Sequence, residues 1–286
     1  MDVCDSISKL RSQLRTRRDH PVVFVPTMGA LHEGHLSLVQ IAREHGGAEA
    51  TVVVSIYVNP TQFDRKDDLD GYPRVLDSDL ENCHEHGVDI VFTPNDLYAN
   101  DATVAVGESR LSLGLCGASR PGHFDGVCTV VAKLFNIVQP DAAVFGEKDF
   151  QQLAVIRRMT RDLDFPIEIV PGPIVREPDG LAMSSRNVRL SAEEREQAIV
   201  LHQALEQARV AVDCGERSAS RLNELIASHI SSAALAKIDY IELVDPDTLE
   251  NLDQIDRQLL AAVAVFFGKT RLIDNFCMRS LDSISS

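Results

Sequence analysis

The chain has 286 residues, 44% of them hydrophobic, which is enough for two ordinary domains or one large one with a sizeable core. Its formal net charge of −15, with lysines and arginines dispersed, excludes nucleic acid as an expected partner. No apolar run approaches the ~20 residues that span a bilayer, so no membrane partner is expected either.

The N-terminal segment and the cysteines favour a cytoplasmic protein. Ile7, Leu10 and Leu14 lie at helical spacing in a charged stretch that lacks the apolar core of a secretory signal. The 6 cysteines stand singly and form no C-x-x-C pair. Reduced thiols are the simple interpretation, and the sequence identifies no protein ligands for a metal.

Apolar runs of strand type alternate with amphipathic helical patterns over the first part of the chain. We expect strands at 22–25, 51–58, 89–92, 142–145 and 167–170, and helices near 36–44, 78–85, 126–138 and 150–162. This alternation is typical of an α/β fold, a Rossmann-like doubly wound parallel sheet covered on both faces. Ligands of such sheets bind beyond the carboxyl ends of the strands, where Pro26, Asn59 and Gly146 lie.

The pattern changes near residue 175. Two long helices are expected at 192–212 and 218–234, the first with Ser191 as N-cap and Glu194 three residues later. A strand follows at 239–244, and strands at 261–267 and 271–276 flank a Gly-Lys-Thr turn as a hairpin. That turn is no P-loop, because Val263 occupies the place of the required glycine. We therefore expect domains at 1–175 and 176–286, the second a smaller α+β lid or dimerisation domain.

The segment from Val22 to Val39 carries the strongest functional signal. A strand passes through a tight turn at Gly29 into an amphipathic helix that begins beside His32 and His35. The free backbone N–H groups and the dipole of a helix start favour an anion. Strand–glycine–helix turns also occur without a ligand, but two imidazoles at the turn add donors for phosphate. The expected ligand is a nucleotide.

Three further loops carry polar side chains that are weak signals singly. Asn59 and Gln62 flank Pro60 after the second strand and offer uncharged donors and acceptors, although an ordinary Asn-Pro turn would look the same. Lys148 can offset charge on a phosphoryl group, although Glu-Lys-Asp is also a common solvated cap. The segment 183–187 offers hydroxyls and a guanidinium on a linker that can close over a ligand, or a plain polar linker.

Together, in this order, the stretches PTMGALHEGH, NPTQF, RPGHFDGV, FGEKDFQQL and DGLAMSSRN resemble the pantothenate synthetase (pantoate–β-alanine ligase) family over nearly the whole chain. A wider kinship joins that family to the nucleotidylyl transferases, whose His-x-Gly-His signature is matched by 32–35. Val188 and Arg189 depart from the family's usual Gly-Tyr, which predicts altered packing at the domain junction rather than lost activity.

The resemblance implies that ATP and pantoate form a pantoyl adenylate, which β-alanine attacks to give pantothenate and AMP. His35, His32 and Lys148 would be catalytic, with His35 the proton donor. Gln62, Gln152 and Asn59 would contact pantoate, and Gln62 also β-alanine. The implied ATP contacts are Met28, Gly29, Ala30, Leu31, His32, Glu33, Gly34, His35, Gly146, Glu147, Lys148, Asp149, Val175, Met183, Ser184, Ser185 and Arg186.

Mg²⁺ should accompany ATP, held mainly by phosphate, with Asp77 and Asp79 as the acidic candidates. A homodimer is the oligomeric state that the family implies. Two alternatives stay open. A nucleotidylyl transferase acting on another small acid or phosphate ester would share the histidine turn but has no use for Gln62 and Gln152 together. A non-catalytic nucleotide-binding module would be expected to have lost a residue such as His35 or Lys148, and both are present.

Overall fold

The computed structural model describes residues 1–280, which form two compact units. Unit 1 consists of Met1–Arg110, Arg120–Glu147 and Gln152–Ile174. Unit 2 consists of Leu111–Ser119, Lys148–Gln151 and the chain from Val175 onward. Two short segments that precede residue 175 in the sequence therefore pack with the C-terminal part of the chain, and one of them contains Lys148.

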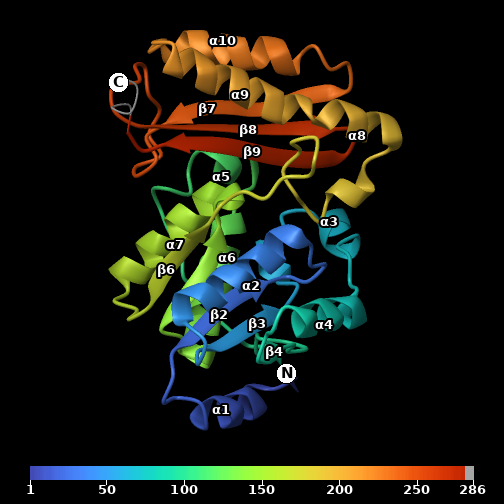
Figure 1. Ribbon diagram of the computed structural model, residues 1–286, viewed down its shortest axis with the longest axis vertical. Coiled ribbons are helices and arrows are strands. Elements are labelled where there is room, and N and C mark those ends of the chain that lie inside the picture. The colour runs from blue at the N-terminus through green and yellow to red at the C-terminus, as the bar shows by residue number, and fades with distance from the viewer. Residues whose placement is uncertain (281–286) are drawn as a thin grey trace. The chain divides into compact units, whose positions relative to one another are not determined.

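Unit 1 is built on a six-stranded sheet in the order β1-β4-β3-β2-β5-β6, with every neighbouring pair parallel (Figure 1). Its strands are β1 (Asp2–Cys4), β2 (Val22–Thr27), β3 (Thr51–Ile56), β4 (Ile90–Phe92), β5 (Ala142–Gly146) and β6 (Glu168–Gly172). Strands β2 to β4 progress along one direction of the sheet, and β5 and β6 along the other. The expected doubly wound α/β fold is confirmed.

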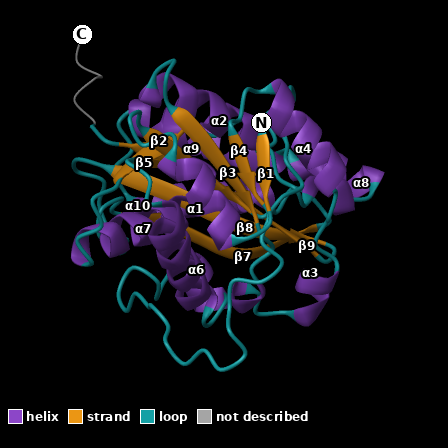
Figure 2. Cartoon of the chain, turned by 90° about the horizontal axis from the view of Figure 1, so that it is seen from below, coloured by secondary structure: helices purple, strands orange, loops and turns teal. Residues whose placement is uncertain are grey.

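Helices cover both faces of this sheet (Figure 2). The helices of this part of the chain are α1 (Ile7–Arg15), α2 (Glu33–Gly46), the short α3 (Lys66–Asp70), which buries no residue, α4 (Leu76–Glu85), α6 (His123–Val138) and α7 (Phe150–Asp162), whose first residues belong to unit 2. On one face, Val39 and Ala42 of α2 and Cys83 of α4 pack with Val25 and Val54 of the strands. Burying those apolar stripes is what holds α2 and α4 against the sheet.

Strand β2 continues through Pro26 to Thr27, two residues beyond the predicted apolar run. Residues of β2 alternate between neighbours: the Val22 carbonyl accepts from Asp141 beside β5, and the Thr27 carbonyl accepts from Tyr57 beyond β3. Pro26 therefore faces the β5 side, where the pairing has already ended at Phe24. The missing proline N–H costs the sheet no hydrogen bond, which is how a proline fits a central strand.

Unit 2 is a three-stranded antiparallel sheet, β7 (Ala236–Val244), β8 (Leu259–Phe267) and β9 (Thr270–Met278), covered by helices. Those helices are α8 (Ala192–Ala198), α9 (Val200–Asp213) and α10 (Ala219–Ile230), and the short α5 (Leu115–Ser119) also belongs to this unit. Leu201, Leu205 and Ile226 pack on Val263 and Val265 of the central strand. Phe267 pairs with Thr270 across Gly268, whose φ is 57°, so the Gly-Lys-Thr sequence is a hairpin turn as predicted.

One predicted helix is interrupted in the structure, and one short strand appears that no pattern predicts. The expected single helix at 192–212 is interrupted at Ile199, where Ala198 and Val200 are both buried on either side of the break. No glycine or proline marks this break in the sequence, so the packing of unit 2 sets it. Strand β1 was not predicted, because its three residues are too few to show a period; its place at the sheet edge comes from pairing with β4.

Candidate active site

The predicted ligand loops of unit 1 leave neighbouring strands at the same edge of the sheet. The histidine turn follows β2, the Asn59–Gln62 segment follows β3, and Gly146 ends β5. Strand β2 lies between β3 and β5, and all three run parallel. The winding direction of the sheet reverses between β2 and β5, which is the position where open α/β sheets bind ligands.

The turn after β2 is held by a buried carboxylate. Gly29 has φ 81° and Ala30 φ 51°, so the chain makes a left-handed turn that favours glycine. Asp79 of α4, 1% exposed, accepts from the N–H of Ala30 at 2.9 Å and of Leu31 at 2.7 Å. A Cβ on Gly29 would stand 2.8 Å from an Asp79 oxygen. The carboxylate and the glycine thus fix the turn together.

Four backbone N–H groups of this turn are already hydrogen-bonded within the chain. The Ala30 and Leu31 N–H groups donate to Asp79, as described above. The His32 N–H donates to Nδ1 of His35 at 3.4 Å, and the Gly34 N–H donates to Nδ1 of His32 at 3.1 Å. The side chains satisfy these donors locally, as capping residues do at helix starts.

The two histidines place their rings side by side at this turn. Each Nδ1 accepts a backbone N–H, so in each neutral ring the proton is on Nε2 by assignment from the hydrogen-bond network. The rings lie 4.1 Å apart between centroids at an angle of 36°. The reciprocal capping box of His32 and His35 therefore opens α2 and fixes two imidazole Nε2–H donors as neighbours.

Asn59 and Gln62 form a buried amide pair around the 3₁₀ turn η1 (Pro60–Gln62). Asn59 Nδ2 donates to Gln62 Oε1 at 2.9 Å and to the Gly126 carbonyl at 3.1 Å. Asn59 Oδ1 accepts from the hydroxyls of Thr61 at 3.0 Å and Tyr98 at 2.9 Å. The two side chains that the sequence singled out are thus in direct contact.

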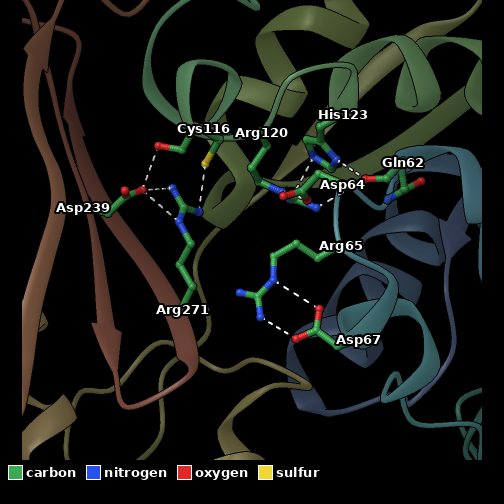
Figure 3. Close-up of polar contacts among 10 residues, drawn as sticks. Gln62, Asp64, Arg65, Asp67, Cys116, Arg120, His123, Asp239 and Arg271 are labelled. Atoms are coloured by element: carbon green, nitrogen blue, oxygen red, sulfur yellow. Dashed lines mark hydrogen bonds and ion pairs between the residues drawn. The ribbon is translucent and has the colours of Figure 1, made fainter.

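Two residues that the sequence did not assign hold the main chain of Gln62 (Figure 3). His123 Nδ1 lies 2.7 Å and Arg120 Nη2 3.3 Å from the Gln62 carbonyl oxygen. Because a carbonyl only accepts, His123 carries its proton on Nδ1. Arg120 also pairs with Asp64 at 2.9 Å; burial of Asp64 is outweighed by this guanidinium, which lowers the pKa of the carboxyl. The RPGHFDGV stretch was the available signal, since Arg120, His123 and Gly126 all come from it.

Lys148 lies in unit 2, in the turn η2 (Glu147–Asp149) between β5 and α7. Its Nζ is 3.7 Å from a carboxylate oxygen of Asp149, which is half-exposed, and such a pair is weak. Its carbonyl accepts from Nδ2 of Asn275 on β9 at 3.0 Å. A buried asparagine therefore fixes the main chain of Lys148, while the ammonium has a loose partner in Asp149. No sequence pattern pointed to Asn275.

The other predicted ATP residues of unit 2 lie on one braced hairpin. The Met183 N–H donates to the Val175 carbonyl at 3.0 Å, and Arg176 and Ala182 form a β-bridge. Beyond it, Ser184 Oγ accepts from the Arg186 N–H at 3.2 Å. The predicted ATP contact at Val175 therefore lies beside the predicted contacts at 183–186, on this hairpin and the turn that follows it. Val188, where the sequence departs from the family pattern, is 81% exposed in the turn η3 (Asn187–Arg189).

Helix α7 carries two adjacent glutamines with different surroundings. Gln151 is buried, and its Nε2 donates to the carbonyls of Leu111 and Gly114, both at 2.8 Å. Gln152, the predicted pantoate residue, belongs to unit 1 and is half-buried. Within the described residues the Oε1 atom of Gln151 is buried without a hydrogen-bond partner, so only its Nε2 end is fixed by the fold.

The acidic candidates for Mg²⁺ are not equivalent. Both oxygens of Asp79 accept backbone N–H groups, so its carboxylate is committed to the turn. Asp77, also on α4, is exposed. Within residues 1–280 no group of three or more His, Cys, Asp or Glu side chains is placed to hold a metal ion.

Replacing Asp79 by asparagine should lower the free energy of unfolding by about 1–3 kcal/mol, the cost of unsatisfied buried donors. The amide keeps one acceptor but turns an NH₂ group toward the second backbone N–H. Denaturant unfolding measures the effect, with exposed Asp77→Asn as the control that should change little.

The pH dependence of this effect has a definite sign. Burial raises the pKa of Asp79 above its ordinary 3.8, against the two backbone hydrogen bonds. Above pH 3.8 the folded chain then holds more protons than the unfolded chain, so stability due to Asp79 falls as pH rises toward the folded pKa. The advantage of the wild type over Asp79→Asn should shrink through that range; an advantage that grows would show that the two backbone hydrogen bonds outweigh burial and that the pKa of Asp79 is not raised.

Comparison with known proteins decides the family. The family model described as pantoate-beta-alanine ligase matches residues 2–277. The chain belongs to the pantoate–β-alanine ligase family. A pantothenate synthetase of Syntrophotalea carbinolica is 54% identical over 279 residues, which cover 96% of this chain and 98% of that protein. One from Akkermansia muciniphila is 51% identical over 280 residues, covering 96% and 99%.

Solved structures agree with this assignment. The crystal structure of pantothenate synthetase from Thermus thermophilus has a TM-score of 0.91 and 44% identity, covering 96% of this chain and 99% of that chain. The pantoate-beta-alanine ligase from Francisella tularensis, complexed with beta-gamma ATP and beta-alanine, has a TM-score of 0.79 and 33% identity, covering 99% and 98%. As a member of this ligase family the chain is an enzyme. No helix within residues 1–280 has the length and apolar character that crossing a membrane requires.

Proposed function

We propose that the chain joins pantoate to β-alanine with ATP, through an enzyme-bound pantoyl adenylate. Membership of the pantoate–β-alanine ligase family supports the ligation itself. The observation that supports the two-step route is the arrangement in unit 1. A pair of imidazoles and a pair of carboxamides leave adjacent parallel strands at one sheet edge, donors for a phosphate beside donors for a small acid.

Chemistry explains why ATP is required. A carboxylate and an amine do not condense in water, because hydroxide is a poor leaving group. In the first step a carboxylate oxygen of pantoate attacks the α-phosphorus of ATP, and the bond from that phosphorus to the bridging oxygen breaks to release diphosphate. In the second step the amine nitrogen of β-alanine attacks the acyl carbon. The bond to AMP breaks, and the nitrogen loses a proton.

The charge that develops on the α-phosphate must be stabilised by fixed donors. The Nε2–H groups of His32 and His35 are positioned for this by their backbone contacts, with His35 as the proposed proton donor. Lys148 supplies a full positive charge, since Asp149 at 3.7 Å is a loose partner. Arg186, Ser184 and Ser185 would hold the remaining phosphates, together with the proposed contacts at Met28–Gly34, Gly146, Glu147 and Val175.

The acid-binding part of the proposal rests on Gln62, Asn59 and Gln152. Amides bind a carboxylate or hydroxyl without the tight ionic clamp that would weaken the nucleophile. The burial of Asn59 and Gln62 also keeps water from the acyl adenylate, which water would hydrolyse. We propose that 183–187 closes over the nucleotide in the same step.

Mg²⁺ is proposed to arrive with ATP as part of the substrate, its ligands being phosphate oxygens with Asp77 as the accessible carboxylate of α4. It would neutralise phosphate charge. A cytoplasmic homodimer is the proposed state of the enzyme, on family grounds.

Isotope exchange between diphosphate and ATP tests the two-step route. We expect exchange that requires pantoate and proceeds without β-alanine, because the adenylate forms and reverts on the enzyme. Amide formation with no exchange in the absence of β-alanine would exclude a free-standing adenylation step. Formation of a stable nucleotide-linked product would instead support the transferase alternative.

A further inference from the structure

The amide of Gln62 has a fixed direction, and the reason lies outside Gln62. The Gly126 carbonyl is an acceptor only, so the Asn59 side chain must turn its NH₂ group toward it. The second proton of that NH₂ group is donated to Gln62, which accepts it with Oε1 at 2.9 Å. Gln62 consequently has its Nε2 end left for a ligand.

The other end of Asn59 is held by two hydroxyls. Tyr98 donates to Oδ1 at 2.9 Å and Thr61 at 3.0 Å, and the two hydroxyl oxygens lie 3.2 Å apart. Asn59 is 1% exposed, so water does not replace these donors. Burial raises the pKa of the Tyr98 phenol, so it remains a donor across the physiological range. The Lys133 ammonium lies 5.4 Å from the ring centroid and helps to hold the ring.

We propose that Tyr98 is a positioning residue that, with Thr61, locks Asn59 and thereby fixes Gln62 with its NH₂ group toward the substrate. We call this chain of hydrogen bonds, from the hydroxyls of Tyr98 and Thr61 through Asn59 to Gln62, the relay. The inference rests on the proposed function, because it takes Gln62 as a pantoate contact. No sequence pattern assigned a role to Tyr98; it acts through Asn59 and touches no substrate.

This arrangement restricts which ligand groups can lie opposite the Gln62 side chain. Its Nε2 can only donate, because Oε1 is the end of the amide that Asn59 holds. A carboxylate or hydroxyl oxygen, or the lone pair of a neutral amine, fits opposite Nε2. A protonated amine offers donors only and is disfavoured, because two donors would face each other in a buried site. The site therefore selects an oxygen acceptor first and an uncharged amine second.

The experiment compares Tyr98→Phe, Thr61→Val and their combination. Each single change should raise the KM for pantoate about 3- to 10-fold, the worth of one hydrogen bond, and the combination more. We expect the KM for ATP to stay within twofold of the wild type, measured by diphosphate exchange. Tyr240→Phe is the matched control: its hydroxyl contacts Cys116 Sγ at 3.3 Å within unit 2, and its loss should leave both values unchanged.

A double-mutant cycle separates positioning from general destabilisation. Gln62→Glu keeps the shape and the acceptor for Asn59 but presents oxygen to the substrate. If Tyr98 acts through the Gln62 NH₂ group, adding Tyr98→Phe to Gln62→Glu should raise the KM for pantoate no further. Independent, multiplying effects would overturn the proposal, as would a combined Tyr98→Phe and Thr61→Val variant within twofold of the wild type.

The proposed function and the relay fail in different ways. Wild-type exchange that does not depend on pantoate would reject the function, and the relay with it. Pantoate-dependent exchange in the wild type with unchanged variants would reject the relay alone.

Discussion

Lys148→Ala is expected to slow pantoate-dependent diphosphate exchange by about 100- to 1,000-fold, the usual cost of removing one donor that stabilises transition-state charge. The loss should fall on kcat, because the charge that Lys148 offsets grows only as the phosphorus–oxygen bonds change. Stability should change little. The ammonium makes a loose contact with Asp149, and the anchor from Asn275 is made to the main-chain carbonyl, which alanine keeps.

Two variants make this result specific. Lys148→Arg keeps the charge and should retain more activity than Lys148→Ala. Lys269→Ala removes an exposed lysine from the Gly-Lys-Thr hairpin and should behave as wild type, since that turn is not a phosphate loop. Turnover of Lys148→Ala near the wild-type value would show that the assigned role is wrong.

Gly126→Ala is expected to cost both stability and activity. A Cβ at this position would lie 2.5 Å from the Thr61 carbonyl oxygen and 2.6 Å from the Gln62 nitrogen. Backbone atoms cannot rotate away as a side chain can, so the turn η1 must move by about 1 Å, and overpacking of this kind costs about 1–3 kcal/mol. A displacement of that size in a substrate-positioning residue can lower kcat/KM by about 100-fold.

The direction of the stability change is informative because Gly126 lies inside α6. In a helix interior, alanine is ordinarily more stable than glycine by up to about 1 kcal/mol. A loss of stability on Gly126→Ala therefore reports the clash with η1. Gly114→Ala is the control: its Cβ would meet Glu242 at an ordinary 3.5 Å. Denaturant unfolding and the KM for pantoate provide the measurements, and a stabilised, fully active Gly126→Ala would contradict the close approach.

Periodicity in the sequence predicts the sheet strands and most helices well, because both express burial. The apolar runs at 22–25 and 142–145 are strands buried on both faces, and α7 has the predicted bounds. Where burial has no local period, prediction fails. Strand β1 is too short, and the break at Ile199 depends on how α8 and α9 pack on their unit.

The site divides in the same way. The amino-acid sequence alone reveals polar side chains that lie next to strand ends, namely His32, His35, Asn59, Gln62 and Lys148. Their partners are distant in sequence: Asp79 lies 48 residues from Leu31, and His123 lies 61 residues from Gln62. Backbone–side-chain contacts of this kind leave no spacing pattern, so the sequence does not single out Asn275 or Tyr98 and does not show that Asp79 holds the turn.

The sequence by itself determined the fold class, the family and the chemical groups at the strand ends, because those depend on residue type and near neighbours. Only the tertiary structure decided which donors remain for a ligand. Asp79 and the histidine rings accept hydrogen bonds from backbone N–H groups of the turn. The Gly126 carbonyl fixes the orientation of the Asn59 amide, which in turn fixes the orientation of the Gln62 amide. In each case the acceptor of a particular N–H group decides whether that group remains for a ligand. The acceptors are atoms that the fold brings together from distant parts of the chain.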